Sequence, residues 1–313
     1  GTDGKHMLDI DHLQESNGSV GVSPSATAYF ATYIKRSDEA SLNYLRKVIK
    51  ADGGMPNVAP FDIFEIAWAL WNLSFIPDLN KNGKLQPHID FLSSAWQPKR
   101  GVGFAADYSV KDSDDTGLVY DTLLRFGCEK DLASVLIYEE RDHFRCFDLE
   151  VNSSISANIH VLGALGQAGL HQKNSSVQKI IRFLQKARGE NPYWVDKWHA
   201  SPYYATAHAI IACAGFAKEA VESSVKWILE EQNKDGSWGT YLPTAEETAY
   251  AIQALWFWNE HVARVPKTVL KNGARWLREN IDQPYPPLWI GKCLYNPRLV
   301  TRSAVISALA LAQ

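Results

Sequence analysis

Lys-Asp-Ser-Asp-Asp-Thr-Gly-Leu, residues 111–118, places three carboxylates within four positions just before an apolar helical run, 117–126. Either Asp114 or Asp115 can cap that helix, because a helix start favours negative charge and needs acceptors for its free N–H groups. One acid is enough for a cap, and three crowded acids repel one another. The most buried of them is therefore expected to have a raised pKa and to stay protonated near neutral pH. The stretch predicts a proton donor beside the start of a helix.

The composition is typical of a globular protein with a large core. The chain has 313 residues, of which 46% are hydrophobic and 21% charged, and this length suits one large domain or two small ones. A net charge of -3 gives no reason to expect nucleic acid as a partner. The aromatic content is high, with 11 Trp, 13 Tyr and 12 Phe, so aromatic packing should dominate the interior. We expect no transmembrane helix, because no apolar run reaches about 18 residues.

The four cysteines lack the short spacings of metal sites, and we expect them to be buried thiols of a cytoplasmic protein: Cys128, Cys146, Cys213 and Cys293. Neither a signal peptide nor a transit peptide is visible. Residues 1–7 have the composition of an expression-tag remnant. We therefore expect residues 8–313 to form a single domain.

Helical periodicity runs through almost every segment, and convincing alternating strands are absent. Helices are expected to begin near Ser23 and Pro60, and to cover residues 38–50, 89–96, 117–126, 131–138, 153–168, 175–188, 204–216, 217–231, 245–259, 267–280 and 299–312. Turns rich in glycine and proline join them into hairpins. The fold class is therefore all-α.

Two loops resemble each other, Gly-Val-Gly-Phe at 101–104 and Asn-Lys-Asp-Gly-Ser-Trp-Gly at 233–239. Each precedes a helix whose start carries acids, 112–115 and 246–247, and Asp-Gly-Gly at 52–54 is a weaker third copy. Recurrent helical hairpins form either an open solenoid or a closed ring. We favour the ring, because open solenoids usually show tighter repeat similarity. The prediction is one α/α barrel of about a dozen helices, with inner helices around a central cavity and outer helices wrapping them.

Short blocks in order along the chain resemble those of class II terpene cyclases. They are Ser-Pro-Ser-Ala-Thr-Ala-Tyr at 23–29, Gly-Gly-Met-Pro-Asn at 53–57 with Phe-Asp-Ile-Phe-Glu at 61–65, Asp-Ser-Asp-Asp-Thr at 112–116, Asp-Lys-Trp-His-Ala-Ser-Pro-Tyr-Tyr at 196–204, Asp-Gly-Ser-Trp-Gly at 235–239, and Trp289 with Lys-Cys-Leu-Tyr at 292–295 and Pro297. No single block is specific, but their order is. The resemblance is closest to single-domain bacterial meroterpenoid cyclases.

The resemblance assigns roles to the acids. In that family the middle Asp of D-x-D-D is the general acid, which maps onto Asp114, while Asp112 and Asp115 set its proton affinity. The hydrogen-bonding group on the neighbouring inner helix maps onto His160, with Asn158 close by. A histidine that donates to one carboxyl oxygen leaves the other free to carry the proton, and it stabilises the carboxylate left behind. The alternative for His160 is a core histidine that only joins two helices.

A carbocation that passes along a polyene needs a dry cavity with electron-rich walls, which aromatic faces supply. The wall candidates lie in or beside the matching blocks: Trp68, Trp198, Tyr203, Tyr204, Trp238 and Trp289. Plain core packing explains any single one of them equally well.

The resemblance implies cyclisation of a linear polyprenyl chain to a fused polycyclic product. We expect the chain to be attached to an aromatic acid, such as a farnesyl or geranylgeranyl hydroxybenzoate. The reason is that the basic residues near the blocks suit one carboxylate better than a diphosphate: Lys99, Arg100, Lys111, Lys197 and Lys292. The D-D-x-x-D motif of metal-dependent synthases is also missing, so no metal or other cofactor is expected.

Three alternatives remain open, and a fourth is set aside because its ligands are missing. The first is a Mg²⁺-dependent copalyl-type cyclase of a prenyl diphosphate. The second is an inverting glycosidase that pairs Asp114 with Glu65 or Glu247. A protein prenyltransferase subunit shares the barrel but needs a zinc trio of Asp, Cys and His, for which no suitable set is visible. The last is a non-enzymatic helical scaffold, which would tolerate Asp114→Asn. Chain length, ring number, terminating base and oligomeric state stay undetermined.

Overall fold

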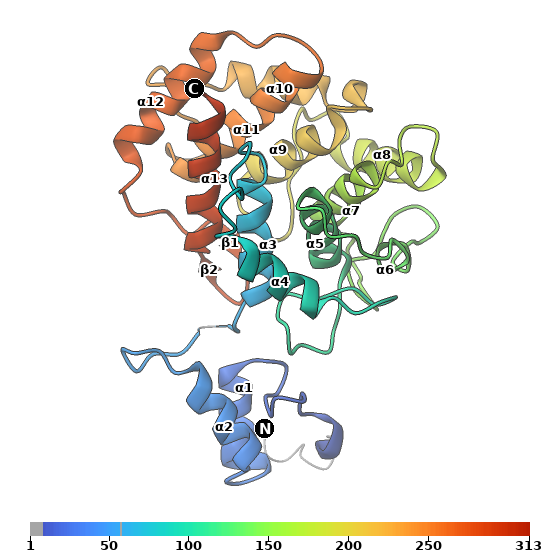
Figure 1. Ribbon diagram of the computed structural model, residues 1–313, viewed down its shortest axis with the longest axis vertical. Coiled ribbons are helices and arrows are strands. Elements are labelled where there is room, and N and C mark those ends of the chain that lie inside the picture. Colours follow the sequence, from blue (N-terminus) through green and yellow to red (C-terminus); the bar gives the residue numbers. More distant parts are fainter. Residues whose placement is uncertain (1–8, 57) are drawn as a thin grey trace.

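The computed structural model describes residues 9–56 and 58–313, so the expected tag remnant at 1–7 lies outside the described residues. The described chain is helical throughout, as expected (Figure 1). Its helices are α1 (Pro24–Tyr29), α2 (Glu39–Val48), α3 (Asp62–Leu73), α4 (Gln86–Ala95), α5 (Ser113–Arg125), α6 (Ala133–Leu136), α7 (Ile155–Gln167), α8 (Ser175–Arg188), α9 (Pro202–Cys213), α10 (Glu222–Glu230), α11 (Ala245–His261), α12 (Lys267–Asn280) and α13 (Arg298–Leu311). Shorter elements are the 3-10 turns Ile10–His12 and Lys218–Ala220, the π-turn Phe30–Ile34, and the antiparallel pair β1 (Trp289–Ile290) and β2 (Leu294–Tyr295).

The helices form the closed ring that the sequence predicted. Helices α3, α5, α7, α9, α11 and α13 each pack on the next, and α13 packs back on α3. Outside them, α4 packs on α3 and α5, α8 on α7, α10 on α9 and α11, and α12 on α11 and α13. Inner and outer helices therefore alternate along the chain, and the fold is an α/α barrel (Figure 1).

The inner and outer helices differ in the pattern of their apolar residues. The inner helix α9 is buried on nearly every side, with Ala212 as its one residue that is not buried. The outer helix α12 buries only Gly273, Ala274 and Leu277. A helix that is apolar all round belongs in a core, whereas an amphipathic helix covers one.

The start of α5 differs from the expected one. The helix begins at Ser113, before its apolar run, because the Asp112 side chain caps it by accepting the N–H of Asp115 at 2.8 Å. The preceding loop is clamped onto this first turn, since Thr116 Oγ1 bonds both the N–H and the C=O of Val102 at 3.0 Å. Gly101 makes this contact possible, because a Cβ at its position would lie 2.3 Å from Thr116 Oγ1. The acids therefore sit in the first turn of an inner helix.

Helices α1 and α2 lie apart from the barrel, beyond the segment that leads into α3 (Figure 1). The segment before α1 contacts the loop before α5, where Glu15 accepts two hydrogen bonds from Ser109 and Val22 packs near Ala105.

The cysteine prediction was half right. Cys146 and Cys213 are buried, whereas Cys128 is half-buried and Cys293 is exposed. Cys293 follows the end of β1 in a surface turn, a location that its spacing in the sequence does not reveal.

Candidate active site

The three acids differ in burial. Asp112 and Asp115 are buried, whereas the Asp114 side chain keeps 15% of its surface exposed, so that a substrate can reach it. Burial raises the pKa of Asp112 to about 7, although the backbone N–H of Asp115 lowers it. Burial also raises the pKa of Asp115 well above its usual range, and the charges of Asp112 and Asp114 raise it further. The raised pKa expected of a buried acid in this cluster therefore belongs to the two acids that flank Asp114.

His160 holds Asp114 from the neighbouring inner helix. Nδ1 of His160, on α7, lies 2.6 Å from Oδ1 of Asp114, and the His160 side chain is almost fully buried. Nε2 of His160 lies 2.8 Å from Nδ1 of His208, on α9. When His160 donates from Nδ1 to Asp114, its Nε2 accepts the Nδ1 proton of His208. The second oxygen of Asp114 then stays free to carry a proton.

Three of the six predicted wall residues gather beside this pair. The Trp68 ring lies 5.2 Å from the His160 ring, and its Nε1 donates to the Tyr204 hydroxyl at 3.0 Å. The Tyr204 and Trp289 rings lie 4.8 Å apart. The rings come from α3, α9 and β1, so closure of the barrel brings them together.

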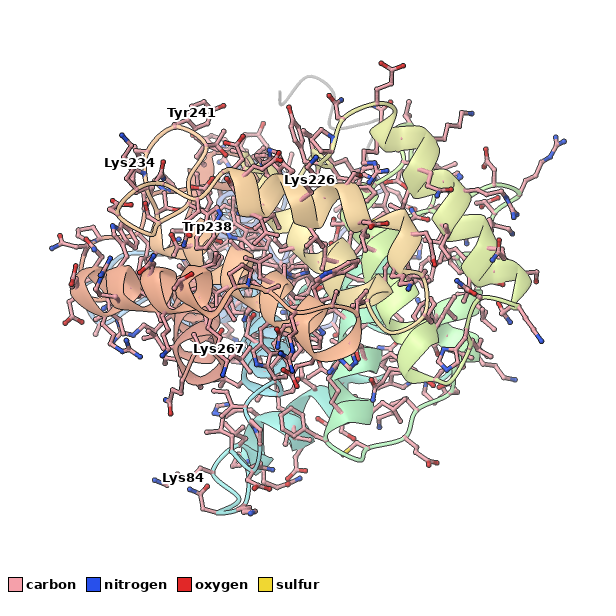
Figure 2. The ribbon with its side chains drawn as sticks, turned by 90° about the horizontal axis from the view of Figure 1, so that it is seen from above. Lys84, Lys226, Lys234, Trp238, Tyr241 and Lys267 are labelled. Atoms are coloured by element: carbon pink, nitrogen blue, oxygen red, sulfur yellow. The ribbon has the colours of Figure 1, made fainter. Side chains whose placement is uncertain are left out.

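The other three lie elsewhere. Tyr203 packs on Trp227 of the outer helix α10, with the rings 4.7 Å apart. Trp198 is half-buried, with the Lys197 ammonium 5.2 Å from its ring. Trp238 lies in the turn between α10 and α11 (Figure 2), where its Nε1 donates to the Ile228 carbonyl at 2.7 Å. The structure does not bring these three side chains to Asp114.

Asn158 is also buried but does not contact the acids. Its Nδ2 donates to the carbonyls of Phe144 and Ser154, and its Oδ1 accepts the N–H of Phe144 at 2.9 Å. It fastens the preceding loop to α7 and so supports the helix that carries His160.

Sequence reasoning assigned no role to a second buried acid and histidine. Glu246 Oε1 accepts from Trp289 Nε1 at 2.7 Å and from the Tyr250 hydroxyl at 3.1 Å, and it lies 3.4 Å from His199 Nε2. The available signal was the acid pair at the start of α11, in the loop that resembles the one before α5. Its neighbour Glu247 accepts from Ser201, Thr240 and Thr244, which leaves it committed to the fold and unsuited to glycosidase chemistry.

The basic residues near the blocks are largely engaged. Lys197 Nζ bonds the buried Glu150 at 2.5 Å and the Asn152 carbonyl at 2.6 Å. Lys111 donates to the Tyr108 carbonyl, and burial lowers its pKa. Within the described residues, no group of three or more His, Cys, Asp or Glu is arranged to hold a metal ion.

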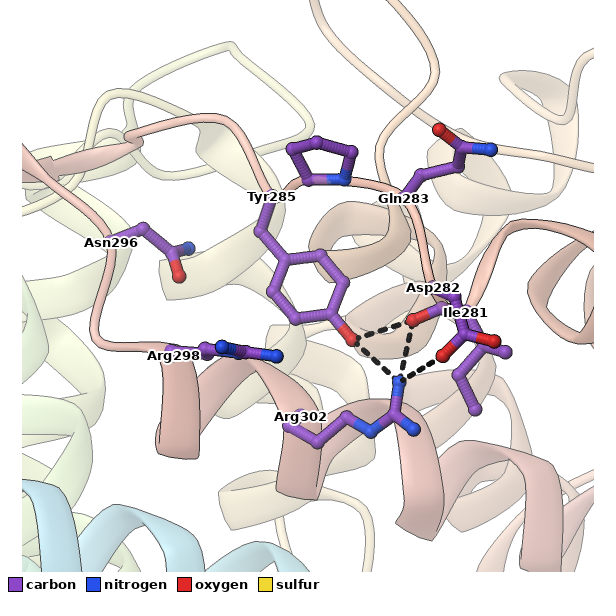
Figure 3. A pocket seen from close by; sticks show the side chains of 8 residues that line it. Ile281, Asp282, Gln283, Tyr285, Asn296, Arg298 and Arg302 are labelled. Atoms are coloured by element: carbon purple, nitrogen blue, oxygen red, sulfur yellow. Dashed lines mark hydrogen bonds and ion pairs between the residues drawn. The ribbon is translucent and has the colours of Figure 1, made fainter.

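A surface pocket of about 570 Å³ lies where α12 and α13 meet the loop between them (Figure 3). Its Arg302 donates to the Ile281 carbonyl and the Tyr285 hydroxyl, and lies 3.6 Å from Asp282. These contacts engage one nitrogen of the guanidinium, Nη1, and the acids of α5 are not part of the lining. We therefore interpret this pocket as a feature of the loop's packing and not as part of the active site.

Comparison with known proteins agrees with the geometry. Residues 146–283 match the squalene-hopene cyclase C-terminal domain. The chain is 43% identical to a type B diterpene cyclase of Mycobacterium tuberculosis, across 99% of this chain and 64% of the relative. It is 32% identical to an ent-copalyl diphosphate synthase of a Streptomyces species, across 95% of this chain and 59% of the relative.

Solved structures give the same result. The ent-copalyl diphosphate synthase of Streptomyces platensis superposes with a TM-score of 0.82 at 32% identity, covering 94% of this chain and 59% of that one. The type II terpene cyclase MstE from Scytonema has a TM-score of 0.61 at 15% identity, covering 79% of this chain and 87% of that one, and shares the fold alone. Along almost its whole length, the chain is therefore similar to diterpene cyclases and copalyl diphosphate synthases. It spans about three fifths of the length of the curated relatives described above.

The structure also bears on membrane association. Among the described helices, none is both long and apolar enough to cross a bilayer.

Proposed function

We propose that this protein cyclises a linear polyprenyl substrate by protonation, with Asp114 as the general acid. The observation that carries the proposal is the 2.6 Å contact between Asp114 Oδ1 and His160 Nδ1. His160 fixes one carboxyl oxygen, so the other presents its proton to the terminal alkene, and His160 then stabilises the carboxylate that forms. The rings of Trp68, Tyr204 and Trp289 stabilise the resulting cation, each by about 2 kcal/mol when water is excluded.

The head group is the finer part of the proposal. The aromatic acid expected from the sequence stays a prediction, since MstE, crystallised with geranylgeranyl dihydroxybenzoate, is only 16% identical to this chain. The relatives at 32% identity are named copalyl diphosphate synthases, which favours a prenyl diphosphate. About two fifths of each of those relatives lies outside the match. The small number of free basic residues in this chain therefore does not count against a diphosphate. We propose geranylgeranyl diphosphate as the first substrate to test.

The test is Asp114→Asn, with Asp148→Asn as the control because it removes the same charge from an exposed side chain. Loss of a general acid costs roughly 10²–10⁴-fold in rate, and we expect the upper end because the flanking acids are buried. The control should cyclise at the normal rate. Normal turnover by a folded Asp114→Asn variant would contradict the proposal.

A further inference from the structure

His160 has a second side, which faces away from the acids. A cavity of about 330 Å³ lies among the carboxyl-terminal halves of the inner helices, whereas the acids occupy the amino end of α5. Its lining runs from the buried His160 and His208 to the exposed Gln167, His171 and His261. The cavity therefore runs from the end of the barrel opposite Asp114 towards the histidine pair, which is itself buried.

His208 ends a continuous chain of polar atoms. Its Nδ1 lies 2.8 Å from His160 Nε2, which leads to Asp114, while its buried Nε2 has no protein partner. An unpaired buried imidazole nitrogen costs about 1–3 kcal/mol unless water bonds it. His208 lines the cavity, so a water there can supply that bond.

The cavity is built to hold water. Asp121 and Arg125 lie in its wall, joined by a 2.7 Å contact between Asp121 Oδ1 and Arg125 Nε. Trp71 donates from Nε1 to the other oxygen of Asp121 at 2.8 Å. Gly163 keeps the space open, because it adds no side chain beside Asp121.

Each cyclisation consumes the proton of Asp114, which must be replaced before the next turnover. We propose that this cavity, through His208 and His160, returns a proton to Asp114 between turnovers; the proposal rests on the proposed function. It gives the enzyme a proton supply that does not require water in the substrate site.

The proton balance is simple. A hydronium ion in the cavity protonates Nε2 of His208, the Nδ1 proton of His208 passes to Nε2 of His160, and the Nδ1 proton of His160 passes to Oδ1 of Asp114. Rotation of the protonated carboxyl group about its Cβ–Cγ bond then turns this proton towards the substrate. Both rings end neutral in the opposite tautomer, and rotation of the rings resets them. The proton lost by the product cation returns to solvent, so each cycle takes up one proton and releases one. Burial, together with His160 and His199, holds the pKa of His208 well below its usual range, so His208 is neutral at rest and passes protons on without storing them.

His208 acts through His160 and does not touch the substrate, so the test must separate the first turnover from later ones. His208→Phe keeps a ring but breaks the relay, and His261→Phe at the exposed rim is the matched control. With geranylgeranyl diphosphate and Mg²⁺, we expect His208→Phe to convert one substrate per enzyme at the normal rate and then to slow by about 10²-fold. The control should show no such burst.

Two further measurements exclude a merely structural role. Added imidazole should restore steady turnover to His208→Gly, because the cavity admits it, and should leave the wild type unchanged. Gly163→Val, whose side chain would enter the cavity beside Asp121, should reproduce the burst. Unchanged steady turnover of His208→Phe overturns the relay, as does equal slowing of both phases without rescue by imidazole. Failure of the wild type to complete even a first turnover with geranylgeranyl diphosphate or with a prenylated hydroxybenzoate would instead overturn the proposed function.

Discussion

Asp112 caps α5 and is at the same time a buried acid, and the two roles can be separated. Burial raises its pKa from 3.8 to about 7, so the folded chain binds this proton more tightly than the unfolded chain does. That stabilisation is complete below the unfolded pKa and is lost as the pH rises towards 7. Asn caps a helix as well as Asp but cannot ionise.

We therefore expect the unfolding free energy of the wild type to fall, relative to Asp112→Asn, as the pH rises from 3.8 to about 7. Urea denaturation of both proteins across this range measures the difference. Parallel pH dependences would show that Asp112 titrates as an exposed acid.

His160 and Trp289 should fail in different ways, because the proposed function places one on the acid and the other beside the path of the cation. His160→Ala should slow initiation and leave the product profile unchanged. Trp289→Leu should release truncated or rearranged products. Gas chromatography of the products, alongside rates, distinguishes them. A normal rate with altered products in His160→Ala would instead place His160 in the cavity wall.

At the scale of elements, α5 and α11 are built alike. Thr248 Oγ1 bonds both the N–H and the C=O of Trp238, as Thr116 does with Val102. Each helix has a capping side chain four residues earlier, Asp112 or Thr244. The likeness of the two loops in the sequence therefore reflects one structural unit used twice, and Glu246 occupies the position of Asp114.

The two ends of α5 offer a matched pair of glycines. Gly101 and Gly127 both have left-handed backbones, with φ of 75° and 77°, but only Gly101 has a neighbour where a Cβ would stand. Gly127→Ala should cost about 1–2 kcal/mol of stability and leave the rate unchanged. Gly101→Ala should cost more and lower the rate, because Thr116 must move beside the acids. Chemical denaturation and rate assays test both, and equal effects would refute the clamp.

Periodicity predicted the existence of nearly every helix but misplaced the starts of α4, α5, α9 and α10. For α5 and α9 the reason is that periodicity counts apolar residues, whereas these two helices begin at polar caps, Asp112 and Ser201. It also could not tell Trp238 from Trp68. Trp238 repeats the contact of Trp194, whose Nε1 likewise donates to a carbonyl of an outer helix, Leu184. Each of these tryptophans lies in a turn and binds that turn to an outer helix.

At the scale of the whole molecule, ring closure determines which residues meet. The Asp114–His160 pair could be predicted because the family motif names both helices. His208 could not, since its contact with His160 depends on how α9 is rotated against α7. The order of hairpins in the sequence predicts that neighbouring inner helices pack on each other. It does not predict which side chains meet between them.

The head group lies at the end of the substrate that does not react. Residues far from Asp114 therefore determine which head group the protein binds. Of the basic residues named from the sequence, Lys197 and Lys111 are committed to Glu150 and Tyr108. Within this chain, Mg²⁺ bound to the substrate is therefore the expected counter-charge of a diphosphate. We expect geranylgeranyl diphosphate to be cyclised with its diphosphate retained, and EDTA to suppress this turnover. Geranylgeranyl hydroxybenzoate, assayed in parallel with EDTA and with Mg²⁺, is the control substrate. Conversion of the benzoate alone, with no effect of EDTA, would restore the aromatic acid as the substrate.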